Sequence, residues 1–424
     1  GLGDVYKRQF KKHRIVKERE QEENKMLQGK TVLLGVTGGI AAYKMPNVAR
    51  MLKKMHCNVH VLMTQNATNF ITATTFETLT GNKCLIDTFD RNFEFSVEHV
   101  ALAKQADLVL LAPATANVIG KIANGIADDM LTTTVMACTC KVLVAPAMNH
   151  NMYHNSIVQE NLEKLKRHGY EMIDPVCGML ANGDTGDGKL PSEETLVEYV
   201  LRELAFEKDM QGLKVLVTAG PTQEAIDPVR FISNHSTGKM GYAIAKNAML
   251  RGAEVTLVTG RTALEPPMFV KTVPVTSAKD MYQAVMECAK EQDIIVKAAA
   301  VADYTPAHTA DEKIKKSEGE LSLALEKTTD ILAELGKNKG NTVLCGFSME
   351  TEHMLENSRA KRKKKNLDMI VANNLKQQGA GFAGDTNVLT LITEDWEKEL
   401  ALMSKDEAAK CLLDELLKIK KNKK

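Results

Sequence analysis

Short apolar runs that alternate with helix-like segments constrain the fold of this 424-residue chain more than any other feature. In the first half, the runs are Thr31–Thr37, Asn58–Thr64, Asp107–Ala112 and Lys141–Ala145. In the second half they are Lys214–Thr218, Glu254–Gly260, Asp293–Ala298, Thr342–Phe347 and Asp368–Asn373, with Asn387–Ile392 as an expected edge strand. Strands that alternate with helices form parallel, doubly wound sheets. The sequence therefore predicts an α/β protein with two such sheets in tandem.

The chain is long enough for two or three domains, and its composition changes suggest where they divide. Residues 1–9 lack an initiator Met and fit no element, and residues 10–28 are highly charged, so we expect 1–28 to be a disordered or artefactual lead-in. We assign residues 29–190 to the first domain, 191–211 to a linker and 212–424 to the second domain. An amphipathic run from Asp406 to Ile419 predicts a terminal helix.

The charge balance and the cysteines limit the functional classes. With 55 Lys and Arg against 54 Asp and Glu, the net charge of +1 gives no electrostatic case for nucleic acid or membrane partners. The basic run Arg359–Lys365 is the one local exception. Eight scattered Cys, without a secretory leader, are typical of reduced thiols in a cytoplasmic protein.

The loops that follow the first-half strands are where a ligand would bind, because parallel sheets bind ligands beyond the carboxyl ends of their strands. Gly38-Gly39 is a weak phosphate-loop signal without the G-x-G-x-x-G spacing, so plain turn chemistry remains an equal alternative. The loops 113–117 and 146–152 each contribute an Asn, whose amide both donates and accepts hydrogen bonds.

Three further side-chain groups in this half admit structural interpretations. A lone His99 before the strand at Asp107 is more often structural or solvated than functional. His150 and His154 lie four residues apart, but no H-E-x-x-H frame accompanies them, which argues against a zinc site. Cys138 and Cys140 lie in an apolar stretch and are most simply core residues.

Five motifs in this half nevertheless resemble, in order, those of the homo-oligomeric flavin-containing cysteine decarboxylases. They are Thr37-Gly-Gly-Ile-Ala-Ala-Tyr-Lys, the His99 segment, Pro113-Ala-Thr-Ala-Asn, Pro146-Ala-Met-Asn and Gly183-Asp-Thr-Gly-Asp-Gly-Lys. The resemblance covers about residues 29–190 and implies a flavodoxin-like, FMN-dependent decarboxylase domain.

In that family, FMN oxidises 4′-phosphopantothenoylcysteine to a thioaldehyde, which allows the carboxylate to leave before the product is reduced. The resemblance makes His99 the base of the oxidative half and Asn149 the residue that holds the substrate carboxylate. It implies that FMN contacts Gly38, Gly39, Ile40, Thr64, Ala116 and Asn117.

One residue departs from this family pattern. The family has an acid Cys directly before the Gly-Asp pair, and here that position is Asn182. An amide cannot act as a general acid near neutral pH. Either Cys177, five residues earlier, replaces it, or Cys177 is a plain loop residue and the reductive half is slow or uses water.

The segment Arg230–Gly241 is the most specific feature of the second half. It lies between a strand and a helix and is rich in Ser, Thr, Asn and Gly, as phosphate-binding loops are. It is not a Walker A loop, because Met240 follows Gly-Lys. An ordinary Ser- and Asn-rich helix cap is the structural alternative.

About residues 212–424 resemble phosphopantothenate–cysteine ligase. The matching segments are Thr218-Ala-Gly-Pro-Thr, Asp227 to Gly241, Lys297-Ala-Ala-Ala-Val-Ala-Asp-Tyr, Lys313-Ile-Lys-Lys and Lys365-Asn-Leu-Asp. Following the decarboxylase motifs, they identify the chain as a member of the bifunctional decarboxylase–ligase family of bacterial coenzyme A biosynthesis.

This second resemblance implies that 4′-phosphopantothenate is activated by CTP and Mg²⁺ to an acyl-cytidylate, from which L-cysteine displaces CMP. Asn234 would hold the acyl-cytidylate and Arg230 the phosphopantothenate, with Lys313 on the CTP phosphates. The implied CTP site comprises Lys297, Ala298, Ala299, Asp303, Lys313, Thr328, Thr329, Asp330, Ile331, Phe347, Lys361 and Lys365. Thr328-Thr329 replaces the family's usual Asn-Pro, and the preference for CTP over ATP is inherited from the resemblance.

Two alternatives remain open at this stage. The chain could be an active ligase with an impaired decarboxylase, as Asn182 suggests, or a non-catalytic flavin-binding regulatory protein. The family also forms decarboxylase trimers and ligase dimers, which implies a homo-oligomer, a dodecamer. Protein residues that bind a metal are not evident from the sequence.

Overall fold

The computed structural model describes residues 25–88, 98–179, 183, 185–315, 322–349, 353–373, 384 and 386–423. The chain divides into two compact units, Gly1–Phe206 and Glu207–Lys424. Within the described ranges, no helix combines the length and the apolar character needed to cross a membrane.

A parallel sheet forms the centre of the first unit, with strand order β2-β1-β3-β4-β5. The strands are β1 (Thr31–Val36), β2 (Asn58–Met63), β3 (Leu108–Ala114), β4 (Lys141–Pro146) and β5 (Glu171–Met172). Every residue of β3 is buried, as expected of a central strand covered on both faces. This is the flavodoxin-like order, whose switch point lies between β1 and β3.

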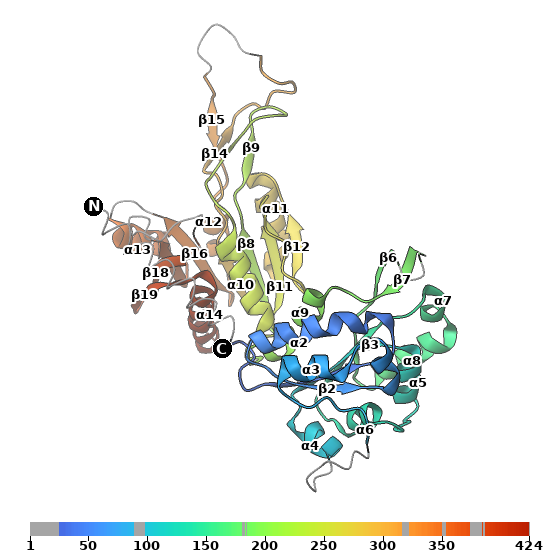
Figure 1. The fold of residues 1–424 in the computed structure, drawn as a ribbon. Coiled ribbons are helices and arrows are strands. Elements are labelled where there is room, and N and C mark those ends of the chain that lie inside the picture. The colour runs from blue at the N-terminus through green and yellow to red at the C-terminus, as the bar shows by residue number, and fades with distance from the viewer. Residues whose placement is uncertain are drawn as a thin grey trace, which may run out of the picture. The chain divides into compact units, whose positions relative to one another are not determined.

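Helices lie on both faces of this sheet (Figure 1). They are η1 (Ile40–Lys44), α2 (Met45–Lys54), η2 (Gln65–Asn69), α3 (Ala73–Thr80), α4 (Glu98–Gln105), α5 (Ala116–Ala123), α6 (Met130–Ala137), α7 (His150–Tyr153), α8 (Ser156–Arg167) and α9 (Glu193–Leu204). Several begin at a side-chain cap: Thr115 Oγ1 accepts from the N–H of Val118, and Asp129 forms a capping box with Thr132. Cys138 and Cys140 pack against the core between these layers.

Three features of the first unit differ from what the sequence predicts. The α-helix after β1 begins only at Met45, where Pro46 occupies the first turn, and a 3₁₀ turn precedes it. Leu27 is fully buried and donates its N–H to Met55 O, so the expected disordered lead-in is wrong at this residue. A hairpin of β6 (Val176–Met179) and β7 (Thr185–Lys189) precedes α9.

The second unit contains a larger sheet, with strand order β12-β11-β8-β13-β16-β17-β18-β19. The strands are β8 (Lys214–Ala219), β11 (Glu254–Thr259), β12 (Lys271–Pro274), β13 (Ile294–Lys297), β16 (Val343–Met349), β17 (Met369–Asn373), β18 (Thr386–Ile392) and β19 (Glu397–Ser404). Pairing is parallel from β12 to β17, and β18 and β19 are antiparallel. The expected edge position of β18 is therefore wrong, because β19 pairs with its outer side.

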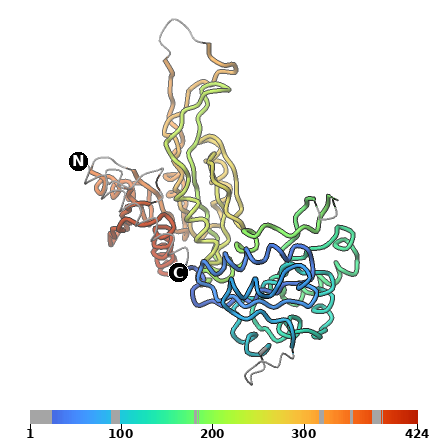
Figure 2. The backbone as a smooth tube through the Cα atoms, viewed as in Figure 1, coloured from blue at the N-terminus to red at the C-terminus, as the bar shows by residue number. Residues whose placement is uncertain are grey.

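Two hairpins extend from this sheet as an arm (Figure 2). They pair β9 (Gln223–Ala225) with β10 (Phe231–Ser233) and β14 (Tyr304–Pro306) with β15 (Leu325–Lys327). We call these two hairpins and the loops joining them the arm.

The helices of the second unit are α10 (Lys239–Leu250), α11 (Ala278–Cys288), η3 (Ala289–Glu291), α12 (Ile331–Lys337), α13 (Met354–Lys364) and α14 (Lys405–Asn422). The predicted terminal helix is thus present as α14, which begins at a capping box between Ser404 and Glu407. An apolar core that includes Leu216, Ile295 and Leu344 fixes the strands whose carboxyl ends form the site described next.

Candidate functional site

A cavity of about 820 Å³ lies in the second unit at the carboxyl ends of β13, β16 and β17. Its wall includes Asn234 and most of the residues predicted for a nucleotide. Those residues are Lys297, Ala298, Ala299, Asp303, Thr328, Thr329, Asp330, Ile331, Phe347, Lys361 and Lys365. Segments far apart in the sequence therefore meet where a parallel sheet is expected to bind its ligand.

One wall is the loop that enters α10. Gly238 has φ +77°, and an added Cβ there would lie 2.8 Å from Thr262 Cγ2. Gly241, in the first turn of α10, lies so close to β8 that an added Cβ would be 2.6 Å from Ala219 Cβ. These glycines let the backbone approach the strand and aim the N-terminus of α10 at the cavity, where N–H groups favour an anion.

The opposite wall is the turn after β13, which is fixed to β8 by hydrogen bonds. The N–H groups of Ala298 and Ala299 donate to Thr218 O (3.2 Å) and Thr218 Oγ1 (3.1 Å). Asn234 Nδ2 donates to Ala300 O at 3.3 Å and so joins the two walls. This hydrogen bond holds the exposed Asn234 side chain at the cavity.

Lysines converge on the same cavity. Lys365 Nζ lies 2.7 Å from Asp330 Oδ2, and Lys297 and Lys361 line the wall nearby. Burial, the ammonium group of Lys365 and that of Lys361 together lower the pKa of Lys297 to about 8, against the opposing effect of Asp330 and Asp303. A cluster of cations of this kind is suited to a polyphosphate.

Two predicted site residues do not line this cavity. Lys313 is exposed on the arm. Arg230 is held by Asp227, with Nε 2.9 Å from Asp227 Oδ2, and its Nη2 donates to Ile314 O at 2.6 Å. Within the described part of a single chain, Arg230 therefore positions the loop that carries Lys313 and does not face the nucleotide cavity.

The cavity is also lined by polar residues that our sequence analysis missed, among them Asn373, Asn387 and Lys405. Oδ1 of Asn373 and Oδ1 of Asn387 are buried without a hydrogen-bond partner among the described residues. Buried acceptors are normally paired, so both are available to a ligand. Their positions at the end of β17 and the start of β18 were the signal that could have identified them.

In the first unit, hydrogen bonds connect the loop after β1 directly to the loop after β3. Thr37 Oγ1 donates to Pro113 O at 2.6 Å and accepts from the N–H of Thr115 at 3.0 Å. Ala116 and Asn117 then form the first turn of α5, with Asn117 exposed. The predicted flavin-binding loops therefore meet at the switch point between β1 and β3.

Two local features of these loops fit a bound flavin phosphate and ring. An added Cβ at Gly38 would lie 2.5 Å from Asn66 Cβ, so only glycine fits there, and Gly39 and Ile40 follow at the start of η1. Thr64 Oγ1, at the end of β2, is buried without a partner among the described residues. A closely packed glycine loop beside an unpaired hydroxyl is suited to phosphate contacts.

The residues predicted to act in decarboxylation do not all lie at one place in the first unit. Asn149 caps α7, since its Oδ1 accepts from the N–H of Asn151 at 2.9 Å, and this leaves its amide nitrogen as the donor for a carboxylate. Cys177 is exposed on β6, in the hairpin that packs against α7. His99 lies on α4, which is separated from α7 within the first unit (Figure 1). Asn182 lies outside the described residues.

A flavodoxin-like domain with a loop-built switch point, followed by a Rossmann-like domain with a cationic cavity, defines a tandem α/β protein with one candidate ligand site in each domain. The flavoprotein family model matches residues 20–205. The model of the DNA/pantothenate metabolism flavoprotein C-terminal domain matches residues 210–419.

The curated relatives are similar to this chain over nearly their whole length. The coenzyme A biosynthesis bifunctional protein CoaBC of Bacillus subtilis is 45% identical over 400 residues, 93% of this chain and 98% of the relative. That of Escherichia coli is 42% identical over 92% of this chain and 97% of its own length. A crystal structure of the C-terminal domain of a CoaBC protein is 41% identical, covering 51% of this chain and 100% of that chain, with a TM-score of 0.45.

The chain therefore belongs to the family of coenzyme A biosynthesis bifunctional proteins CoaBC. This confirms the family resemblance, the tandem α/β fold and the expectation of a bifunctional decarboxylase and ligase. The first unit is a flavoprotein domain.

Proposed function

We propose that the cavity of the second unit binds CTP and joins L-cysteine to 4′-phosphopantothenate, and that the first unit, with FMN, decarboxylates the product to 4′-phosphopantetheine. One observation carries this proposal. Asn234, the turn after β13 and the lysines Lys297, Lys361 and Lys365 meet around one cavity of about 820 Å³.

The chemistry assigned to this cavity is acyl activation. The carboxylate of 4′-phosphopantothenate attacks the α-phosphorus of CTP, and pyrophosphate leaves. The amine of cysteine then attacks the acyl carbon, and CMP leaves. Lys297, Lys361 and Lys365 stabilise the negative charge that develops on the phosphates, and Asn234 holds the acyl-cytidylate.

Mg²⁺ is proposed as the companion ion of the triphosphate. Mg²⁺ prefers oxygen ligands, and it is commonly held by one or two carboxylates together with substrate phosphates. Asp303 and Asp330 line the cavity and supply such oxygens. Asp303 is the stronger candidate because Asp330 is already paired with Lys365.

In the first unit we assign FMN to the loops of Gly38, Gly39, Thr64 and Ala116–Asn117. FMN held by these residues would supply the redox chemistry, as acceptor of the reducing equivalents of the substrate and as their donor after the carboxylate is lost. Asn149 orients the substrate carboxylate through its amide nitrogen. Cys177, on the hairpin that packs against α7, is the proposed proton donor in the reductive half, in place of Asn182.

Assembly of several copies is part of this proposal. His99 lies on α4, apart from α7 within one chain, and Lys313 lies on the arm, outside the cavity wall. We infer that neighbouring copies supply His99 to the decarboxylation site and Lys313 to the nucleotide phosphates. A homo-oligomer, a dodecamer in the form implied by the family, satisfies both requirements.

The ligase assignment is tested by separating its two half-reactions. Full-length protein is incubated with 4′-phosphopantothenate, CTP and Mg²⁺, and cysteine is added later. We expect pyrophosphate before cysteine and CMP only after it. With Asn234→Asp, the acyl-cytidylate should accumulate or hydrolyse, whereas exposed Asn338→Asp should behave as the unmodified protein. Normal amide formation by Asn234→Asp would refute the role of Asn234.

A further inference from the structure

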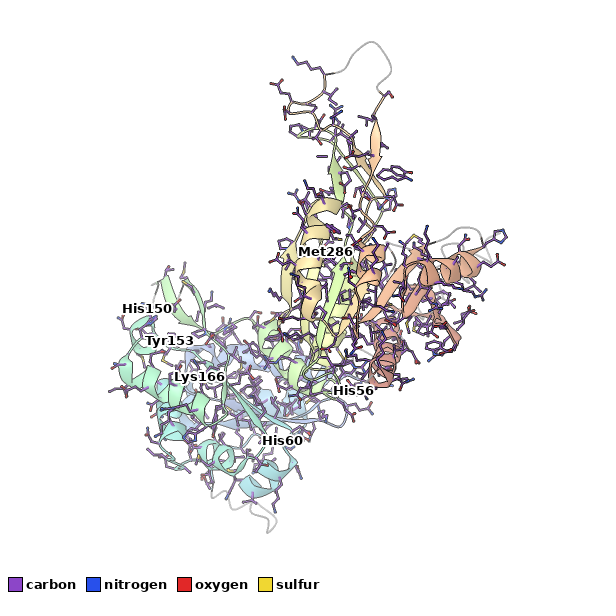
Figure 3. All side chains as sticks on the ribbon, turned by 180° about the vertical axis from the view of Figure 1, so that it is seen from behind. His56, His60, His150, Tyr153, Lys166 and Met286 are labelled. Carbon is purple, nitrogen blue, oxygen red and sulfur yellow. The ribbon has the colours of Figure 1, made fainter. Side chains whose placement is uncertain are left out.

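Two histidines of the first unit face each other at α7. His150 begins the helix and His154 follows its last residue, so the two side chains are one helical turn apart. Their ring centroids are 4.4 Å apart and their planes meet at 62°. Figure 3 shows His150 beside the hairpin β6–β7. The i, i+4 spacing places both imidazoles on one side of the helix.

A carboxylate from a different element completes the group. Asp187 lies on β7, and its Oδ2 is 3.1 Å from His154 Nε2. One ligand atom from each of His150, His154 and Asp187 lies within 4.8 Å of the other two. The sequence argued against zinc because no H-E-x-x-H frame is present, but the third ligand comes from a residue 33 positions away along the chain.

The backbone fixes the position of Asp187. Met148 N–H donates to Gly188 O at 3.0 Å, and Gly188 has φ +120° with an added Cβ only 2.3 Å from Met148 O. At Gly186, an added Cβ would lie 2.8 Å from His150 Nδ1. Glycine is therefore needed on both sides of Asp187, and the hairpin packs closely enough on residues 148–150 to present this carboxylate to the histidines.

The ion pair between His154 and Asp187 does not account for one polar atom of this group. His150 Nδ1 is buried and makes no hydrogen bond within the described ranges. A buried polar atom without a partner is uncommon and usually indicates a water or an ion. Pairing between His154 and Asp187 accounts for two of the three side chains and leaves His150 unexplained.

We propose that His150, His154 and Asp187 bind a divalent transition metal ion of the Zn²⁺ class. Two imidazoles and a carboxylate are a ligand set that suits Zn²⁺, whereas Mg²⁺ and Ca²⁺ prefer oxygen ligands. Zn–N and Zn–O bonds of about 2.0–2.2 Å require ligand atoms about 3.3–3.6 Å apart in a tetrahedron. The ligand atoms, now within 4.8 Å of one another, must therefore approach by about 1.5 Å at most, with water as the fourth ligand.

Binding of this ion fastens the hairpin β6–β7 to α7. The hairpin carries Cys177, and α7 begins next to Asn149, so the ion fixes the distance between two residues assigned to decarboxylation. The metal site itself does not depend on that assignment or on the ligase Mg²⁺. Its test is therefore a binding measurement and not an activity assay.

The test is calorimetric titration of metal-stripped, full-length protein with Zn²⁺, together with Co²⁺ absorption spectroscopy. We expect one equivalent per chain, with affinity at least about tenfold lower in Asp187→Asn and in His154→Gln. The matched control, His168→Gln, changes an exposed histidine of the same unit and should leave affinity unchanged. Amide exchange in β7 should slow when Zn²⁺ is added to the unmodified protein.

Three results would overturn the proposal. The first is no stoichiometric binding by the unmodified protein. The second is equal affinity in Asp187→Asn, His154→Gln and the unmodified protein. The third is a thiolate-to-cobalt charge-transfer band, which would show that the free cysteines, and not the histidines, hold the ion.

Discussion

Lys365 and Asp330 form an ion pair in the wall of the nucleotide cavity, with Nζ 2.7 Å from Oδ2. Asp330 also caps α12, since its Oδ1 accepts from the N–H of Ala333 at 3.0 Å. Burial would raise the pKa of Asp330, but the hydrogen bond from Lys365 keeps that pKa below its usual value. One carboxylate therefore positions both a cation for the phosphates and the start of a helix.

Replacing Lys365 should weaken nucleotide binding. In Lys365→Met, the phosphates lose a charge-assisted contact of about 1.5–3 kcal/mol and meet the unpaired carboxylate of Asp330. We expect the KM for CTP to rise about ten- to hundredfold with a smaller change in kcat, measured by CTP-dependent pyrophosphate release. Lys337→Met removes a comparable ion pair with Glu334 on the surface of α12 and should change KM less than about twofold. Equal KM values in the two variants would contradict the phosphate contact.

The affinity for CTP should fall as the pH rises through about 8. The pKa of Lys297 is about 8, so the ammonium form that attracts phosphate is present below this pH and lost above it. Bound phosphate raises the pKa again, which links binding to proton uptake. We expect CTP binding to be about tenfold weaker at about pH 9 than at about pH 7, at fixed free Mg²⁺.

Lys297→Met serves as the control for this pH dependence. It should bind CTP more weakly at neutral pH and show a flat profile over the same interval, as measured by calorimetry. A flat profile in the unmodified protein, or an unchanged slope in Lys297→Met, would exclude Lys297 as the titrating group.

Flavin retention should depend on the absence of a side chain at Gly38. In Gly38→Ala, the new Cβ would lie 2.5 Å from Asn66 Cβ, so the loops after β1 and β2 must separate. We expect the purified variant to carry a small fraction of the flavin of the unmodified protein, measured by absorbance after release. Gly120→Ala, within α5, places a Cβ in ordinary contact at 3.7 Å from Asn161 Nδ2 of α8, and this variant should retain flavin. Full flavin content in Gly38→Ala would show that these loops do not hold the cofactor.

The arm should loosen when the buried carboxylate of Asp227 is lost. Burial would raise its pKa, yet hydrogen bonds from the N–H groups of Val229, Arg230 and Ile314 and from the Arg230 side chain hold it well below the usual range. This stabilisation is present above about pH 4, the unfolded value, and is lost as the pH falls toward the folded pKa.

The measurement for the arm is limited proteolysis. In Asp227→Asn, the Arg230 and Ile314 contacts weaken, and we expect trypsin to cleave after Lys313 and Lys315 several-fold faster at neutral pH. Asp311→Asn, which changes an exposed carboxylate of the same loop, should be cleaved at the original rate. Identical rates in both variants would show that Asp227 does not hold the arm.

The sequence predicted the parts of this structure that depend on local chemistry. Apolar runs identified β1, β8 and β16 because buried parallel strands are continuously hydrophobic. Strand order then brought Ala299, Asp330 and Lys365 together, since the carboxyl ends of parallel strands share one edge of the sheet.

The sequence did not predict which distant segments pack against one another, nor did it predict the short exposed strands. The strands of the arm and of the hairpin β6–β7 span only three to five residues, which is too short for a pattern of alternating apolar residues to identify them. The same limit hid the pairing of His154 with Asp187 and the contact that keeps Arg230 away from the cavity. Each depends on the surface against which a hairpin packs, and no local pattern in a single sequence indicates that surface.

The most direct test of the central claim is an end-product assay on the purified, full-length protein. It is supplied with 4′-phosphopantothenate, L-cysteine, CTP and Mg²⁺, and the products are resolved by mass. We predict 4′-phosphopantetheine in step with CMP release, which requires both units to be active and Asn182 to be compensated. Phosphopantothenoylcysteine as the sole product would show that decarboxylation is not completed, and no CTP-dependent consumption of cysteine would contradict the account of both sites.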